Sequence, residues 1–258
     1  VYYIMNIIAY QGSKRKELKI IKEYQPKQFQ RIIDVFGGGA NVSLGYLKDG
    51  YVVQYNDILS SMCGLLTILK DNDKTDSLIK EYNEVVKNNS IEKFYKIFDK
   101  EIIISDEARL IYLSCLCFRS MLTSRMPKLT KGVINKCKKI EYYKKFYELF
   151  KKLTITNKDY KDILEQYKND SNMFLYLDPP YVSKKTNEYD VDFTIKDLQY
   201  IKKFMGECKC KVMLHIDFTG YTYDLFKQYI KHYYSIRYGM CGKSKDIKDI
   251  YCKYHIIL

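Results

Sequence analysis

The chain has 258 residues, and its 44 Lys and Arg outnumber its 31 Asp and Glu, which gives a formal net charge of +13. Hydrophobic residues make up 47% and charged residues 29%, which excludes wholesale disorder and suits one globular domain, or one domain with an insertion. No apolar run approaches the about 18 residues of a membrane-spanning helix, so we expect no membrane partner.

Helices and strands are predicted to alternate in the first third of the chain. A basic amphipathic helix is expected over residues 13–24, and a short strand over residues 32–36 ends at a run of three glycines. A helix follows from residue 41, a second strand covers residues 51–55, and a further helix covers residues 60–69. Such alternation is typical of a parallel sheet covered by helices.

The middle of the chain is predicted to be helical, and the strands return after it. Residues 72–167 are rich in Lys and Tyr and carry few strand signals. Strands are expected at 173–177 and 211–216, helices at 195–205 and 221–229, and a closing strand pair at 233–240 and 250–258. The order predicts an α/β fold with a doubly wound, mostly parallel sheet in 1–71 and 168–258, and a mainly helical inserted domain in 72–167.

Three features of the sequence indicate the cellular compartment and whether a metal is bound. They are the cysteines, the histidines and the first residues. The eight Cys residues form no CxxC pair, and the three His residues are scattered along the chain. The first residues lack a basic segment followed by a long apolar run, which argues against a signal peptide. We therefore expect reduced thiols, no bound metal and a cytoplasmic protein.

A glycine-rich turn follows the first strand and is expected to bind a cofactor. Glycines at the carboxyl end of a strand let the backbone approach a ligand closely, and an acid after the next strand is the usual partner of ribose hydroxyls. A tight turn beside a surface carboxylate is the structural alternative. GxGxxG and GxxxxGK[ST] are absent, so S-adenosylmethionine is favoured over NAD and ATP. The candidate residues are Asp34, Phe36, Gly37, Gly38, Gly39, Asp57 and Ile58.

The tetrapeptide Asp178-Pro179-Pro180-Tyr181 directly after an apolar strand is the expected catalytic site. An exocyclic amine on an aromatic base is a poor nucleophile because its lone pair is delocalised into the ring. A carboxylate and a backbone carbonyl that accept hydrogen bonds from the amine favour a localised lone pair, and two prolines fix that carbonyl in place. The tyrosine offers a face on which a flipped-out base can stack. A rigid turn with a capping Asp is the alternative.

The segment Tyr10-Gln11-Gly12-Ser13-Lys14 opens the first predicted helix and is a third candidate. Backbone N–H groups at a helix N-terminus favour anions such as a carboxylate. Tyr10 is placed to pack on a cofactor's adenine ring, while Gly12 and Lys14 complete the motif. An ordinary N-cap by Ser13 explains the same pattern.

Together and in this order, the three segments resemble the DNA adenine methyltransferase (Dam-like) family. Its FxGxG motif resembles Phe36 to Ala40, with Ala40 in place of the last glycine, and its DPPY matches Asp178 to Tyr181 without change. The resemblance implies a Rossmann-like methyltransferase fold that uses S-adenosylmethionine and releases S-adenosylhomocysteine, with target recognition by the insertion. By that resemblance, the residues that contact the cofactor are Tyr10, Lys14, Asp57 and Asp178.

Much of the positive charge lies between residues 111 and 152, where eleven Lys and Arg face two acids for a net charge of +9. Such a cluster suits phosphate contacts, although a solvated helix face explains residues 138–152 equally well and AT-rich codons favour Lys. Residues 118–120 read Phe-Arg-Ser where the family often has Tyr-Asn-Gly, which bears on the target sequence. The candidate DNA-binding residues are Arg119, Ser120, Arg125, Lys128, Lys131, Lys184 and Lys185.

These observations predict a site-specific enzyme that methylates the exocyclic amine of a flipped-out adenine in double-stranded DNA. The alternatives are a cytosine-amine or RNA methyltransferase, or a catalytically inactive DNA-binding relative. Beyond DNA, the expected partner is a cognate restriction enzyme, and the expected state is a monomer or weak dimer.

Overall fold

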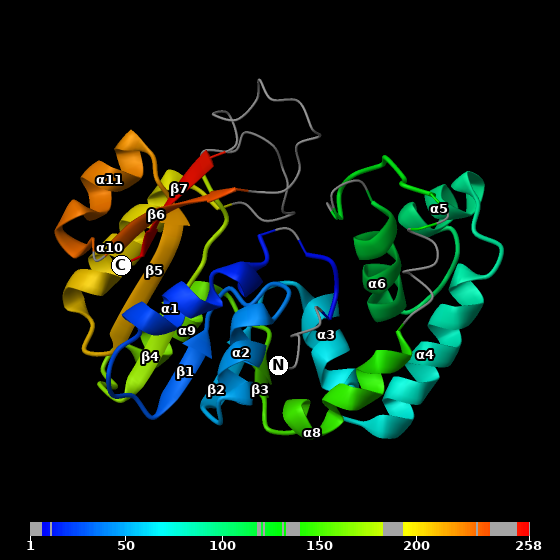
Figure 1. Ribbon diagram of the computed structural model, residues 1–258, viewed down its shortest axis with the longest axis horizontal. Coiled ribbons are helices and arrows are strands. Elements are labelled where there is room, and N and C mark those ends of the chain that lie inside the picture. The colour runs from blue at the N-terminus through cyan, green and yellow to red at the C-terminus, as the bar shows by residue number, and fades with distance from the viewer. Residues whose placement is uncertain are drawn as a thin grey trace.

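The structure is a computed structural model, and it describes residues 7–10, 12–117, 120, 122–130, 132, 140–182, 193–230, 232–237 and 252–257. Within these ranges, seven strands form one sheet in the order β3-β2-β1-β4-β5-β7-β6 (Figure 1). The strands are β1 (Arg31–Asp34), β2 (Val52–Asn56), β3 (Thr154–Thr156), β4 (Met173–Leu177), β5 (Lys211–Asp217), β6 (His232–Arg237) and β7 (Cys252–Ile257).

The first five strands of this order are parallel, and the last two are antiparallel. β1 pairs with both β2 and β4, so the strand order reverses direction at β1. β7 pairs antiparallel with β5 and with β6, which confirms the closing strand pair expected from the sequence. The pairing of Asp34 with Tyr176 brings the carboxyl ends of β1 and β4 side by side, where α/β sheets of this kind bind ligands.

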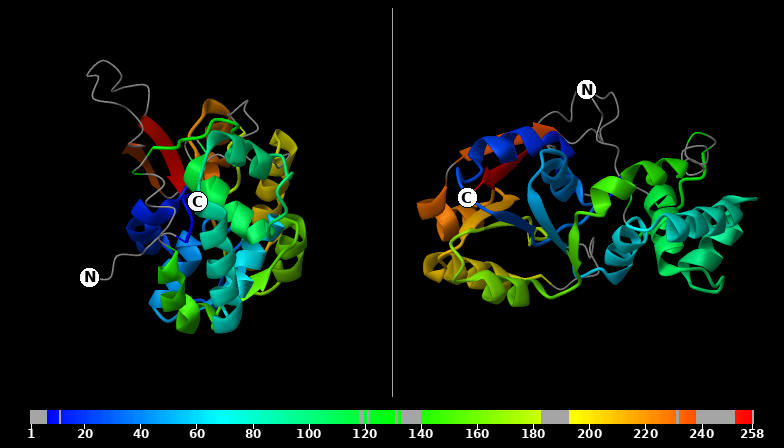
Figure 2. Two further views of the ribbon diagram at one scale, coloured as in Figure 1. Left: turned by 90° about the vertical axis from the view of Figure 1, so that its right-hand side faces the viewer. Right: turned by 90° about the horizontal axis from the view of Figure 1, so that it is seen from below.

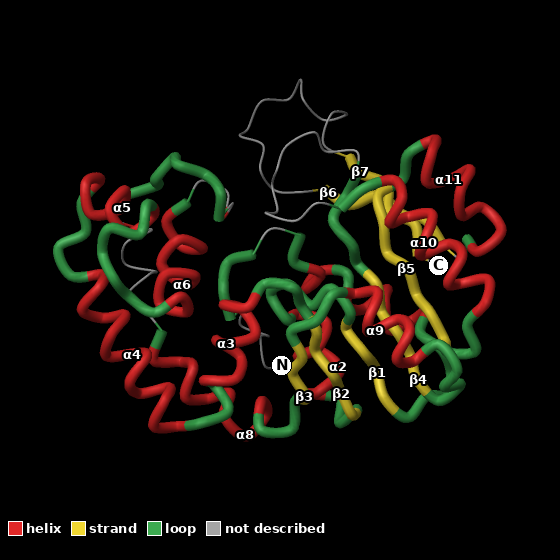
Figure 3. Tube along the Cα trace, turned by 180° about the vertical axis from the view of Figure 1, so that it is seen from behind, coloured by secondary structure: helices red, strands yellow, loops and turns green. Residues whose placement is uncertain are grey.

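Helices cover both faces of the sheet. Successive strand residues point to opposite sides, so each face buries its own set of side chains. In β4, Phe174 and Tyr176 belong to one buried cluster, while Leu175 and Leu177 belong to the other. The first face is covered by α1 (Leu18–Tyr24) and α2 (Asn41–Lys48). The second face, which faces the viewer in Figure 3, is covered by α9 (Tyr160–Tyr167), α10 (Ile195–Glu207) and α11 (Gly220–Phe226). The doubly wound fold is therefore confirmed.

A helical insertion forms a second lobe beside the sheet (Figures 1 and 2). After α3 (Ser60–Ile68), the chain forms α4 (Asn72–Val86), α5 (Ile91–Phe98), α6 (Asp106–Leu116), the 3-10 helix η3 (Glu141–Phe146) and α8 (Tyr147–Phe150). Its buried side chains, among them Tyr82, Phe94 and Tyr112, join the same apolar cluster as the first face of the sheet. None of the helices in the described ranges has both the length and the apolar character needed to cross a bilayer.

The structure corrects the end of the insertion, which the sequence placed at residue 167. Residues 154–156 form β3 and pair in parallel with β2, and Ile163 and Leu164 of α9 pack against the second face of the sheet. A three-residue edge strand with the sequence Thr-Ile-Thr is too short to give a clear period-two pattern. The chain therefore returns to the sheet by residue 154.

Candidate active site

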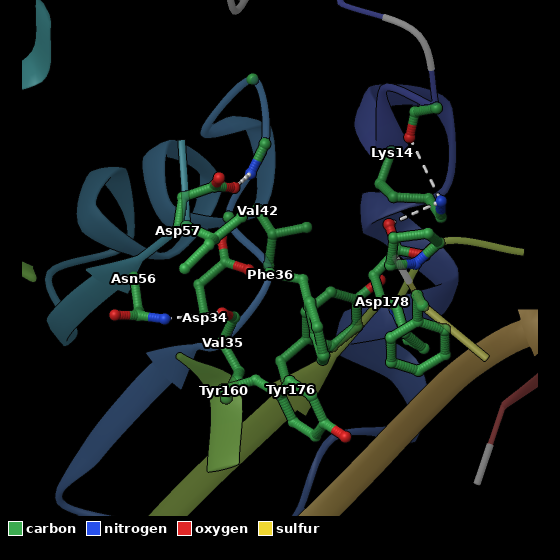
Figure 4. Close-up of a pocket in the computed structure, with 18 of the residues that line it drawn as sticks. Lys14, Asp34, Val35, Phe36, Val42, Asn56, Asp57, Tyr160, Tyr176 and Asp178 are labelled. Carbon is green, nitrogen blue, oxygen red and sulfur yellow. Dashed lines mark hydrogen bonds and ion pairs between the residues drawn. The ribbon is translucent and has the colours of Figure 1, made fainter. Parts of the chain in front are cut away.

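A pocket opens at the carboxyl ends of β1, β2 and β4, and all three predicted motifs line it (Figure 4). The 3-10 helix η1 (Lys14–Lys16) brings the N-terminal segment to its edge. The residues predicted from the sequence that the structure brings together here are Tyr10, Gly12, Lys14, Asp34, Phe36, Gly37, Gly38, Gly39, Asp57, Ile58, Asp178, Pro179, Pro180 and Tyr181.

The glycine turn between β1 and α2 needs glycine for steric reasons. A Cβ on Gly37 would overlap the ring of Tyr55, and Gly38 has a φ of +47° with Tyr10 only 2.9 Å from the position of a Cβ. The Tyr55 hydroxyl donates a hydrogen bond to the Gly38 carbonyl at 2.9 Å. Ala40, which replaces the family's last glycine, also takes a left-handed conformation, with a φ of 57°. That conformation costs an L-residue roughly 1–2 kcal/mol.

Asp57 joins the end of β2 to the glycine turn. Its Oδ2 accepts a hydrogen bond from the Gly38 N–H at 2.7 Å, and its Oδ1 accepts one from the Leu59 N–H at 2.8 Å. Burial raises the pKa of this carboxyl above its ordinary value, and these backbone hydrogen bonds oppose the rise. Asp57 therefore both fixes the turn and presents a carboxylate at the pocket wall, beside the half-exposed Ile58.

Asp34 has a structural partner as well as a place in the pocket wall. Its Oδ2 accepts hydrogen bonds from the Ser43 N–H at 3.1 Å and from the Ser43 hydroxyl at 2.7 Å. Desolvation raises the pKa of this fully buried carboxyl to about 7, although both hydrogen bonds lower it. Asp34 thus satisfies a free N–H in the first turn of α2, where an acid also suits the helix dipole.

The DPPY segment follows β4, and its carboxylate forms an ion pair with a lysine near the N-terminus. Lys14 Nζ lies 2.6 Å from Asp178 Oδ2, and the side chains are 4% and 15% exposed. The lysine also donates to the Gly12 carbonyl at 3.2 Å and to the Tyr181 hydroxyl at 3.4 Å. Burial raises the pKa of Asp178, while the charge of Lys14 and its hydrogen bond lower it. The ion pair therefore favours an anionic carboxylate in a dry site.

Three aromatic rings form a pocket wall that the sequence did not predict in full. The ring of Tyr160 lies 5.2 Å from that of Phe36 and 5.8 Å from that of Phe193, measured between centroids. The Tyr160 hydroxyl donates to Asp197 Oδ1 at 2.7 Å. Sequence reasoning placed Tyr160 in the insertion and so missed it. The available signal was Asp159, which caps α9 by accepting from the Lys161 N–H at 2.8 Å.

The candidate DNA-binding residues lie outside the pocket or outside the described residues. Arg119, Lys131, Lys184 and Lys185 belong to the latter group. Arg125 makes a two-pronged ion pair with Asp99 at 2.5 and 2.9 Å and lies over the rings of Tyr95 and Phe98 in α5. Lys128 is exposed, and Ser120 is half-buried with a φ of 57°. Their contact with DNA stays a prediction.

The fold and the pocket together define a Rossmann-like methyltransferase. The strand order brings the glycine turn, Asp57 and the DPPY carboxylate into one pocket. Such a pocket suits a nucleoside cofactor next to an amine acceptor.

The chain belongs to the D12 class N6 adenine-specific DNA methyltransferases, whose family model matches residues 10–251. It is also similar to the Type II methyltransferase M.CviBI of Paramecium bursaria Chlorella virus NC1A, with 24% identity over 261 residues that cover 98% of each chain. The protein is therefore a site-specific adenine DNA methyltransferase of an S-adenosylmethionine-dependent family, and DNA is its substrate. The fold and the activity predicted from the sequence are confirmed.

Proposed function

We propose that the pocket binds S-adenosylmethionine and that Asp178 accepts a hydrogen bond from the adenine amine of double-stranded DNA during methyl transfer. The observation that carries this proposal is the buried Lys14–Asp178 ion pair, which lies in the same pocket as the glycine turn and Asp57. When bound, S-adenosylmethionine supplies an electrophilic methyl group and leaves as S-adenosylhomocysteine.

The residues present fit this cofactor. The turn at Gly38 has no space for a side chain beside Tyr10, so only bare backbone can line that part of the pocket. Asp57 offers a carboxylate to hydroxyl groups at one side of the pocket, and Lys14 with Asp178 offers both charge signs at the other (Figure 4). A sulfonium cofactor with an amino acid moiety carries groups complementary to both sides.

The roles that we propose for the DPPY residues follow from their positions. Asp178 and the Pro179 carbonyl accept from the target amine and so help localise its lone pair, while Lys14 keeps Asp178 anionic. Tyr181 lies beside Lys14 at the pocket wall and offers a ring on which an extruded base can stack. Acceptors aimed at the reacting amine in a dry site are the expected source of much of the rate acceleration.

We also propose that the helical insertion recognises the target sequence, that the enzyme acts as a monomer or weak dimer, and that a restriction enzyme shares its target. The name of M.CviBI as a Type II methyltransferase supports the last point. Digestion of DNA from a host that expresses this protein would test it, because a restriction enzyme of matching specificity would fail to cut that DNA.

Expression in a methylation-free host, followed by mapping of modified bases, tests the main proposal. We expect methylation at one short duplex sequence, and we expect Asp178→Asn to reduce turnover by about 100-fold or more while DNA binding persists. Asp224→Asn is the matched control, since that side chain is 76% exposed on α11. Turnover that survives Asp178→Asn would contradict the catalytic role.

A further inference from the structure

A cluster of polar side chains lies buried behind the Lys14–Asp178 pair and has no part in the chemistry described above. We call Glu17, Tyr176, His215 and Tyr234 the buried cluster. The Tyr176 hydroxyl lies 2.9 Å from His215 Nδ1, and the Tyr234 hydroxyl lies 2.9 Å from His215 Nε2. Glu17 Oε2 accepts from the Tyr234 hydroxyl at 3.0 Å and lies 3.3 Å from His215 Nε2. The cluster therefore joins a 3-10 turn to β4, β5 and β6.

Three of the four members are buried, Tyr234 is partly buried, and the cluster touches the active site at two points. Glu17, Tyr176 and His215 are each at most 1% exposed. Tyr176, a residue of β4, lines the pocket and lies two residues before Asp178 in the sequence. The Glu17 N–H donates to the Lys14 carbonyl at 2.9 Å, which closes the turn that presents Lys14. Movement of Glu17 would therefore be transmitted to the lysine.

The protonation of Glu17 depends on the charges of Lys14 and Asp178. Desolvation raises the pKa of Glu17 to about 7, with Lys14 opposing the rise and Asp178 adding to it. His215 faces Glu17 from β5, so an imidazolium there would stabilise the carboxylate. The titratable or charged groups that face Glu17 or His215 from the surrounding elements are Lys14, Lys16, Tyr176, Asp178 and Tyr234.

A gain in stability is by itself a weak explanation for buried ionic groups such as Glu17 and His215. Well-packed apolar side chains of similar volume often replace buried ionic groups with neutral or favourable effect. Loss of the proton from Glu17 would place a second carboxylate beside Lys14, in competition with Asp178. The position of the cluster therefore affects how Lys14 is shared between Glu17 and Asp178.

We propose that Glu17 is a positioning residue for methyl transfer. Glu17 holds Lys14 against Asp178 as long as the Glu17–His215 pair keeps a proton. When that proton is lost, Lys14 is released from Asp178. The inference rests on the role proposed above for Lys14 and Asp178. It concerns residues of this chain alone and predicts a dependence on pH that Asp178 does not produce.

The test compares the wild type with Glu17→Gln, which keeps the side-chain shape and an oxygen acceptor for Tyr234. Without cofactor or DNA, we expect the melting temperature of the wild type, relative to the variant, to fall from about pH 5 to about pH 8. The reason is that a carboxyl with a raised pKa in the folded state contributes stability that is lost as pH rises through that pKa. A constant difference would show that Glu17 does not titrate and would overturn the proposal.

The second measurement is the single-turnover methylation rate at saturating S-adenosylmethionine and duplex DNA. We expect the ratio of the wild-type rate to the Glu17→Gln rate to fall about threefold or more between about pH 6 and about pH 8. A ratio that is constant or rises, beside a melting difference that changes with pH, would make Glu17 merely structural. Glu23→Gln is the matched control on the exposed face of α1 and should leave both readouts unchanged.

A third variant, Lys14→Met, separates this inference from the proposed function. In that background Glu17→Gln should no longer alter the dependence of the rate on pH, because no lysine remains to be shared. A persistent effect would overturn the route through Lys14. A wild-type rate in Lys14→Met itself would instead contradict the proposed role of Lys14, whatever Glu17 does.

Discussion

Lys14 Nζ lies 2.6 Å from Asp178 Oδ2, with the lysine side chain 4% exposed, so a cation from the first motif neutralises the carboxylate of the last one. The pairing counteracts the desolvation that raises the pKa of Asp178. It also places the lysine ammonium 5.6 Å from the ring centre of Tyr181. The two motifs therefore act as one site.

Replacement of Lys14 by Met should leave Asp178 as an unpaired buried carboxyl whose pKa rises further. A raised pKa means that the carboxyl ionises only as pH increases, so the methylation rate should fall by about 10-fold or more near pH 7 and recover in part at higher pH. Single-turnover rates between about pH 6 and about pH 9 check this expectation. A loss that is the same at every pH would show that Lys14 does not act through the ionisation of Asp178.

The glycine turn should tolerate no side chain at Gly37. Because a Cβ there overlaps the ring of Tyr55, we expect Gly37→Ala to lower the free energy of unfolding by about 1–3 kcal/mol and to weaken cofactor binding. Gly206→Ala on α10 is the control, because its Cβ would meet only the Tyr229 hydroxyl at 3.5 Å. Alanine there should be neutral or stabilise by up to about 1 kcal/mol. Urea unfolding and calorimetry measure both effects.

Asp34 should make folding stability depend on pH. Its pKa in the folded protein is raised to about 7 from an ordinary value of 3.8, so the folded state binds the proton more tightly than the unfolded state. The stability contributed in this way is complete below the ordinary value and is lost as pH rises toward about 7. Asp34→Asn keeps an acceptor for Ser43 and should melt progressively higher than the wild type as pH rises. Parallel melting curves over the range would refute the titration.

Arg125 tests the DNA-contact prediction for the insertion. If the guanidinium meets a phosphate, Arg125→Ala should weaken DNA binding and reduce the slope of log affinity against log salt by about one. Lys203→Ala on α10, with a lysine side chain that is 74% exposed, controls for the general loss of positive charge. An unchanged slope would assign Arg125 to its ion pair with Asp99 and its stacking on α5 alone.

The parts of the site that the sequence predicted are those in which the chemistry lies in contiguous residues. The glycine run, Asp57 and the DPPY segment each follow an apolar strand, so their place at the carboxyl edge of a sheet could be inferred from order and spacing. Asp34 was predicted on the same ground, but its contact with Ser43 depends on how α2 packs. Ala40 shows that the backbone keeps its left-handed turn without the expected glycine.

The fold class, the motifs and the methylation chemistry could be predicted from the amino-acid sequence alone, because periodicity and short motifs are local properties of the chain. Three features could not be predicted in this way: residues 154–167 return to the sheet, Tyr160 and Phe193 complete the pocket, and Glu17 lies beside His215. These contacts join residues far apart in the chain. They arise from strand order and register, in which Thr154–Thr156 pairs with β2 and Tyr176 lies beside both Asp34 and Met213. Neither strand order nor register is written in any single segment, because both depend on the combined packing of helices on the two faces of the sheet.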